Sequence, residues 1–182
     1  YLVVNLQTVV SRTVNPVEPA VVTVGSFHAG SGFNVIADSA SLAGTVRTFD
    51  REQRLAIKRN IERIVRDTCS MFGADYSLDY ILGYPPVIND NREYERFERI
   101  AASLTGQANV RLDAPLMAGE DFSYYLQQIP GCFVLVGAGN PDTGAVYPHH
   151  HPRFDIDERA MLLLAKVLAR LALDRLSQDS EP

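Results

Sequence analysis

Three consecutive histidines, His149, His150 and His151, stand between two prolines and account for three of the four histidines in the chain. Neutral imidazole is the commonest protein ligand for zinc and related ions. The flanking residues Pro148 and Pro152 reduce the conformational freedom that is lost when a loop is ordered around an ion. In an extended segment His150 would face away from His149 and His151, because adjacent side chains alternate. Residue types alone leave metal binding and an ordinary surface turn as equal alternatives.

The sequence does not supply a complete metal site. A mononuclear zinc site uses three or four protein ligands, and a two-metal site uses more, often with a bridging carboxylate. No HxxxH, HExxH, CxxC or HxD spacing occurs in the 182 residues. The chain also opens at Tyr1 without an initiator methionine, with apolar residues already at helical spacing. We therefore expect it to be the C-terminal portion of a longer protein.

The composition is that of an ordinary globular protein, with 46% hydrophobic residues. The 17 basic and 22 acidic residues are spread along the chain, without the clustered Lys and Arg that nucleic acid binding requires. The most apolar run, residues 161–165, is interrupted by Lys166 and Arg170 well before a membrane-spanning length. We therefore expect no nucleic acid or membrane partner. Cys69 and Cys132 have no paired spacing, which favours reduced thiols and a cytoplasmic location.

Hydrophobic periodicity predicts a mixed α/β chain. The first part has the order helix, strand, strand, helix, strand, which is the split βαβ or ferredoxin-like arrangement without its first strand. The segments are a helix from Leu2, strands at 21–27 and 42–49, a helix at 50–72 and a strand at 76–82.

The pattern changes past Pro86. A helix capped by Asp90 or Asn91 is followed by the apolar run 132–136, typical of a strand buried on both faces, and by a closing helix at 157–173. This second part is typical of half of an α/β domain. We place the domain boundary after residue 84.

Several short motifs follow one another at plausible spacings. They are Leu6-Gln7, Ser11-Arg12, Asn15-Pro16, Asn34-Val35-Ile36, Gly44-Thr45-Val46-Arg47-Thr48-Phe49, Tyr84-Pro85-Pro86, Gly119-Glu120-Asp121-Phe122, Pro130-Gly131, and His150-His151-Pro152 with Phe154. With these motifs the chain resembles, over nearly its whole length, the metal-dependent amidohydrolases and carboxypeptidases of the aminoacylase and hippurate hydrolase type. The closest branch acts on N-acyl amino acids.

The resemblance implies hydrolysis of the amide bond of N-acyl amino acids or small peptide-like substrates by a two-domain enzyme. Two divalent metals per subunit, zinc, manganese or similar, would activate water. Residues 1–84 would be a ferredoxin-like lid that lacks its first strand and forms a homodimer, and residues 85–182 the C-terminal part of the α/β catalytic domain. The general-base glutamate and the other metal ligands would precede Tyr1, so we expect no catalytic residue in this chain and no activity from it alone.

The resemblance also assigns residues to the site. The late His-x-Pro histidine of the family falls on His150, as a metal ligand. Asn34 and Arg47 match a polar pair of the lid that holds substrate from across the dimer, and a guanidinium can bind a carboxylate through two charge-assisted bonds. The alternative is a surface arginine and a turn asparagine. Ala37 departs from the family, which usually has proline there.

Two further residues are considered for the site. Glu120, beside Asp121, could orient a metal ligand or organise the pocket, or could simply begin a helix. His28 is interpreted as a structural residue at the end of a strand. For the protein as a whole, the alternatives to a hydrolase are a non-catalytic dimerisation and binding module and a metal-free family member whose remaining part has lost its ligands.

Overall fold

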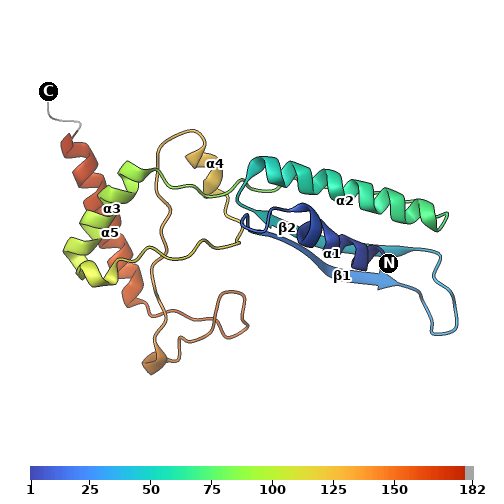
Figure 1. The fold of residues 1–182 in the computed structure, drawn as a ribbon. Helices are drawn as coiled ribbons and strands as arrows, with labels where there is room; N and C mark the ends of the chain where they lie inside the picture. The colour runs from blue at the N-terminus through green and yellow to red at the C-terminus, as the bar shows by residue number, and fades with distance from the viewer. Residues whose placement is uncertain (179–182) are drawn as a thin grey trace. The chain divides into compact units, whose positions relative to one another are not determined.

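The computed structural model describes residues 1–178 and contains both helices and a sheet, consistent with the predicted α/β class (Figure 1). Its elements are α1 (Leu2–Thr13), β1 (Ala20–Ala29), β2 (Ala40–Thr48), α2 (Arg51–Met71), α3 (Asn91–Thr105), α4 (Phe122–Leu126) and α5 (Arg159–Gln178), with 3₁₀ turns at Gln107–Asn109 and Pro141–Thr143. No helix of the described part is long and apolar enough to cross a membrane.

The chain divides into two compact units. The first unit comprises residues 1–86 and 115–123, and the second comprises residues 87–114 and the chain from Tyr124 onward. The prediction of a lid at 1–84 and a catalytic portion at 85–182 concerns the domains of a whole protein and stays a prediction.

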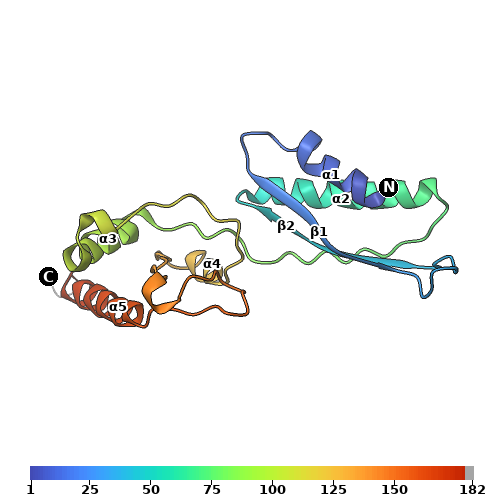
Figure 2. The ribbon, with the colours of Figure 1, turned by 90° about the horizontal axis from the view of Figure 1, so that it is seen from below.

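The first unit is a β-hairpin covered on one face by two helices (Figure 2). β1 and β2 pair antiparallel with a bulge between Val24 and Ser26. Gly44 is required for this pairing, because a Cβ at that position would overlap the backbone oxygen of Thr23. The hydrophobic core lies between α1, α2 and the hairpin, and its buried members are Leu6, Val9, Ile57, Ile61, Ile64 and Val65.

The predicted helix at 50–72 is confirmed as α2. Its N-cap is Asp50, whose side chain accepts a hydrogen bond of 2.7 Å from the backbone N–H of Gln53. This contact satisfies one of the amide groups that a helix start leaves unpaired. The helix ends at Met71, and Gly73 follows with a positive φ of 63°, a conformation that favours glycine.

The strand predicted at 76–82 is wrong for this structure. The segment lies without a partner strand, and the sheet contains only β1 and β2 among residues 1–178. Tyr80 packs against the core of the first unit, and the Lys58 ammonium lies 5.8 Å from the centre of its ring. Tyr80 is the one side chain of the segment that is half-buried, while Tyr76, Leu78, Ile81 and Leu82 are exposed, and the backbone lacks the neighbour that a ladder needs.

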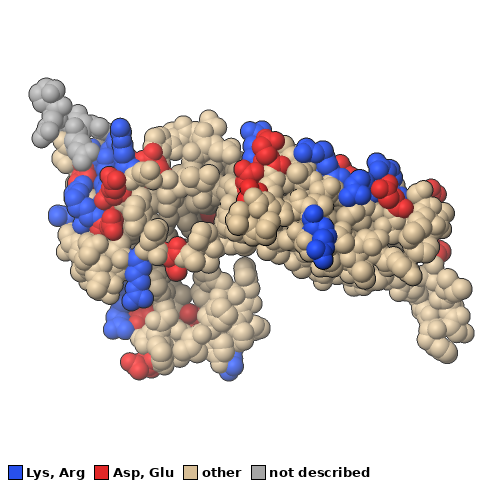
Figure 3. Space-filling view, viewed as in Figure 1, with Lys and Arg blue, Asp and Glu red and all other residues tan. Residues whose placement is uncertain are grey.

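In the second unit, α3 and α5 lie side by side, joined by Arg99, which donates two hydrogen bonds of 2.9 and 3.0 Å to Asp174. Asp90 caps α3 by accepting bonds from the N–H groups of Arg92 and Glu93. The strand predicted at 132–136 is also wrong here, because this run has no strand partner in the described residues. On the face seen in Figure 3, basic and acidic side chains are interspersed and form no basic patch.

Candidate functional site

The three histidines form a tight turn. The N–H of His151 donates to the carbonyl oxygen of Pro148 at 3.2 Å, and His150 has a φ of 67°, the only positive value at a non-glycine position among the described residues. The interpretation that an extended segment separates His150 from its neighbours is therefore wrong, because the backbone bends here. What distinguishes the three imidazoles is their packing.

Two of the three imidazoles are held by neighbouring groups. His151 stacks on Tyr147 with ring centres 4.3 Å apart and planes 10° apart, and its Nδ1 accepts a hydrogen bond of 3.1 Å from the N–H of Arg153. His149 packs edge-on against Phe154 at 4.8 Å. The ring of His150 is exposed and makes no hydrogen bond to any other residue in the described range, so its nitrogens are available to an ion.

The residues fit a metal ion only in part. No group of three or more His, Cys, Asp or Glu side chains among residues 1–178 could hold a metal ion. His150 is the candidate ligand here, an exposed imidazole on a fixed backbone. A stable zinc or manganese site would need further donors, since these ions take three or more protein ligands.

A polar network fixes the chain that follows the turn. The carboxylate of Asp157 accepts hydrogen bonds from the N–H of Arg159 at 3.0 Å and from Nδ2 of Asn140 at 2.7 Å, while its own N–H donates to Ala138 at 2.8 Å. These hydrogen bonds, those from Arg159 above all, hold the pKa of Asp157 well below its usual range. Asp157 supports the start of α5.

Arg47 and Asn34 lie at opposite ends of the hairpin. Arg47 on β2 pairs with Val21 near the open end, and Asn34 lies in the exposed loop beyond Ala29. The eight residue steps from Val21 to Ala29 correspond to roughly 25 Å at the usual rise of a strand. The hairpin therefore does not bring the two side chains of one chain together.

The guanidinium of Arg47 lies beside the segment 115–123 of the first unit. A Cβ built on Gly119 would be 4.0 Å from Nη2 of Arg47 and 3.5 Å from Cδ2 of Tyr84. Nη1 donates to the carbonyl oxygen of Val46 at 3.1 Å, and Arg47 has no ion pair with an acidic residue in the described chain. The cation is therefore available to an anionic group that reaches this side of the sheet.

Glu120 begins α4. Its Oε1 accepts a hydrogen bond of 3.1 Å from the N–H of Phe122, and its carbonyl oxygen accepts one of 2.6 Å from the hydroxyl of fully buried Ser123. These contacts support the interpretation as a helix start. A role for Glu120 in a pocket stays a prediction.

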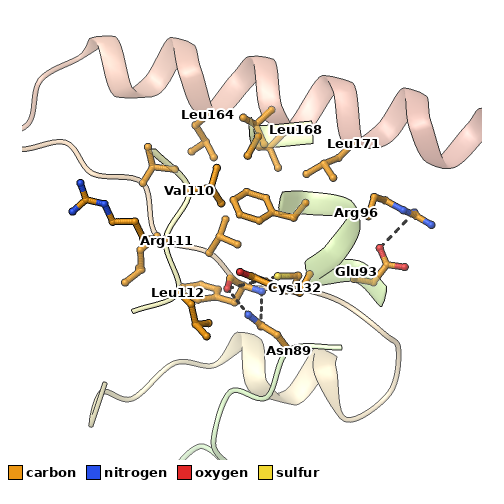
Figure 4. A pocket seen from close by; sticks show the side chains of 18 of the residues that line it. Asn89, Glu93, Arg96, Val110, Arg111, Leu112, Cys132, Leu164, Leu168 and Leu171 are labelled. Carbon is orange, nitrogen blue, oxygen red and sulfur yellow. Dashed lines mark hydrogen bonds and ion pairs between the residues drawn. The ribbon is translucent and has the colours of Figure 1, made fainter. Parts of the chain in front are cut away.

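The second unit contains a cavity of about 1840 Å³ that both apolar and charged side chains line (Figure 4). Leucines of α5 point into it toward Val110, and the run 132–136 lines another side. The side chain of Asn89 pairs with the backbone of Phe133, donating to its oxygen at 2.9 Å and accepting from its N–H at 2.8 Å. Beyond this pair, the backbone groups of residues 134–136 make no hydrogen bond within the described chain.

The Cys132 thiol in the lining of this cavity is not poised as a nucleophile. Burial raises the pKa of the Cys132 thiol, and the nearby carboxylates of Glu93 and Asp90 raise it further, so that the thiol stays protonated at neutral pH. The side of the cavity formed by the leucines of α5 and the run 132–136 is suited to burying apolar side chains. In the sequence, the apolar run 132–136 is the one sign of this cavity. Sequence reasoning missed Tyr147 and Arg153, although an aromatic and a cationic residue beside the histidines were a signal that could have identified them.

Comparison with known proteins identifies the class to which these features belong. The family model described as Peptidase family M20/M25/M40 matches residues 5–174, and the chain belongs to this family. The prediction of a hydrolase family of amidohydrolases and metallopeptidases is confirmed.

Relatives and a solved structure extend over almost all of the chain. YhaA of Bacillus subtilis (strain 168) is 47% identical over 172 residues, covering 94% of this chain and 43% of its own length. N-acetyl-L-cysteine deacetylase of the same organism is 37% identical over 182 residues, covering 99% and 42%. The crystal structure of the Bacillus subtilis YXEP protein, a dinuclear metal binding peptidase from the M20 family, has a TM-score of 0.74 at 31% identity, covering 97% and 44%. The chain therefore spans about two-fifths of the length of these proteins.

Proposed function

We propose that this chain is part of a metal-dependent amidohydrolase that cleaves the amide bond of N-acyl amino acids or small peptide-like substrates. The observation that carries the proposal is the match to this family, in which one relative is named a deacetylase of an N-acetylated amino acid and a structural neighbour a dinuclear metal binding peptidase. The exposed imidazole of His150 on its turn adds a feature suited to the same chemistry.

The proposed roles follow from the chemistry of the side chains. Two divalent metal ions, when bound, would polarise the amide carbonyl and activate water. His150 contributes one nitrogen ligand. Arg47 binds the substrate carboxylate through paired charge-assisted hydrogen bonds, and Asn34 orients a polar group of the substrate. The general base and the remaining ligands belong to the protein outside this chain.

The two predicted domains take different parts in this proposal. Residues 1–84 are the lid, whose ferredoxin-like sheet is completed by a strand from outside this chain. Residues 85–182 are the C-terminal part of the catalytic domain, where further strands pair with the run 132–136. The two free cysteines support a reducing, cytoplasmic location.

The lid also forms the homodimer in this proposal. Phe33 and Ile36, on either side of Asn34, are 103% and 96% exposed, and apolar side chains at such a loop tip favour burial against another protein surface. Since Asn34 lies roughly 25 Å from Arg47 along the hairpin, we assign Asn34 to the active site of the partner subunit and Arg47 to that of its own. This assignment revises the expectation that both residues reach the same neighbouring pocket.

The test uses the full-length protein and a panel of N-acetyl amino acids. We expect amide hydrolysis that is lost on chelation and restored by zinc or manganese. His150→Ala should lower the rate of hydrolysis about a hundredfold or more, because removal of a metal ligand costs at least as much activity as removal of a residue that hydrogen-bonds to a ligand. His28→Ala is the control, since His28 lies on β1 opposite Ser41. Unchanged turnover in His150→Ala would refute the ligand assignment. A metal-free dimer inactive on the whole panel would favour the non-catalytic module or the metal-free family member.

A further inference from the structure

The turn that presents His150 has an unusual backbone. His150 is the third residue of the turn that the hydrogen bond from His151 to Pro148 closes, and its φ of 67° lies in the left-handed region. At this position of a turn a positive φ is typical of glycine or asparagine. A histidine stays in this conformation only where surrounding contacts hold it there.

The contacts that hold the turn come from the residues on either side of it. The rings of Tyr147, which precedes the turn, and His151, which closes it, stack at 4.3 Å. The guanidinium carbon of Arg153 lies 4.2 Å from the centre of the Tyr147 ring. His151 also accepts hydrogen bonds from the backbone, at Nδ1 from Arg153 at 3.1 Å and at its carbonyl oxygen from Phe154 at 2.9 Å.

We propose that Tyr147 is a positioning residue for the metal ion, acting through its stack on His151 to hold His150 in the conformation that presents its imidazole. The inference rests on the proposed function, because it requires His150 to be a ligand. The stack joins the two ends of the turn, so that the ligand is ordered before the ion binds. Pre-ordering lowers the entropy lost on binding and so raises the affinity.

The stack has a second consequence for the choice of ligand. The ring of His151 lies against Tyr147 and its Nδ1 is occupied by the N–H of Arg153, so this imidazole is withheld from an ion that His150 binds. The aromatic and cationic neighbours thereby remove one of the three adjacent histidines as a nitrogen donor. Their role is to orient a ligand, as residues that contact the ligands without touching the ion do in other metal sites.

The experiment measures metal binding by the full-length protein, independently of turnover. Zinc affinity is determined by competition with a chromophoric chelator, and the cobalt-loaded protein is examined for its visible absorption bands. We expect Tyr147→Ala to weaken zinc binding about tenfold and to change the cobalt spectrum. Tyr147→Phe keeps the ring and restores affinity to within about twofold of the wild type. Tyr76→Ala, at an exposed tyrosine of the first unit, is the control.

A second pair of variants covers a failure of Tyr147→Ala to fold. His151→Ala removes the stack from the other side and is expected to weaken binding about tenfold, whereas His151→Phe keeps the ring and loses the acceptor for Arg153. Wild-type affinity in both alanine variants overturns the positioning role. If His150→Ala weakens binding while they do not, only this inference fails. If His150→Ala also binds metal like the wild type, the ligand assignment of the proposed function fails with it.

Discussion

The length of the hairpin predicts that one active site uses Arg47 of its own chain and Asn34 of the partner subunit. Arg47 lies beside Gly119 of its own chain, and the loop that carries Asn34 begins roughly 25 Å further along the strands. This separation far exceeds the length of an N-acyl amino acid. One chain therefore cannot bring both side chains to one substrate unless the hairpin itself is rebuilt.

Each substitution alone, made in the full-length protein, should lower kcat/KM. Arg47→Ala removes a pair of hydrogen bonds to a charged group, which corresponds to about 3 kcal/mol or about a hundredfold. Asn34→Ala removes an uncharged contact and should cost about tenfold. Both variants should remain folded dimers, because Asn34 is exposed and Arg47 forms no ion pair within the described chain.

The decisive assay combines the two variants in one dimer. Co-expression with two different affinity tags allows the heterodimer of Arg47→Ala and Asn34→Ala chains to be purified. One of its two sites then contains both wild-type side chains, so activity should return to about half of the wild-type value.

The reciprocal heterodimer is the control. It pairs a wild-type chain with a chain that carries both substitutions, and each of its sites then lacks one of the two side chains. We expect it to be nearly inactive. The reverse pattern, an inactive mixed heterodimer with a half-active reciprocal one, would show that both side chains come from the same subunit and would refute the reasoning.

Two further predictions concern stability of the full-length protein. Gly44→Ala should separate the two strands locally and lower stability by about 1 to 3 kcal/mol, because the new Cβ overlaps the backbone oxygen of Thr23, whereas Gly83→Ala, in open space, should change stability little by thermal unfolding. Asp157 has a lowered pKa, so its carboxylate stabilises the fold fully above the unfolded value of about 3.9 and progressively less as pH falls toward the folded value. Asp157→Asn should therefore lower the melting temperature at pH 7, and the difference in melting temperature from the wild type should narrow below about pH 4. A difference in melting temperature that is equal at all pH values would contradict this role of Asp157. The control is Asp155→Asn, and the same effect from that variant would also contradict it.

Local sequence signals predicted the elements that local contacts stabilise. The helix at 50–72 was predictable because Asp50 supplies the cap and the isoleucines of α2 recur at helical spacing, and both features act within the segment itself. The hairpin was predictable from two neighbouring β-branched runs. The predicted strands at 76–82 and 132–136 failed because strand formation depends on a neighbouring chain, which periodicity does not reveal.

The candidate site was predictable in its residues and not in its geometry. The family resemblance singled out His150, and the alternation argument reached the same residue on the wrong assumption of an extended backbone. The stack of Tyr147 on His151 depends on how a turn closes, and sequence spacing does not specify ring orientation. The opposite placement of Asn34 and Arg47 could have been anticipated, since thirteen residues on a hairpin arm exceed the reach of one substrate.

The cavity of the second unit connects stability with the candidate site. In this unit the buried hydrophobic residues are few, and leucines of α5 that could each contribute roughly 1.5 to 3 kcal/mol on burial face the cavity instead (Figure 4). His149 lines the same cavity and packs on Phe154. In the complete protein that we propose, the strands that fill the cavity would therefore fix the His149 side of the turn, as Tyr147 fixes the His151 side. His150 would then be held from both directions, and its metal affinity would depend on the completion of the hydrophobic core.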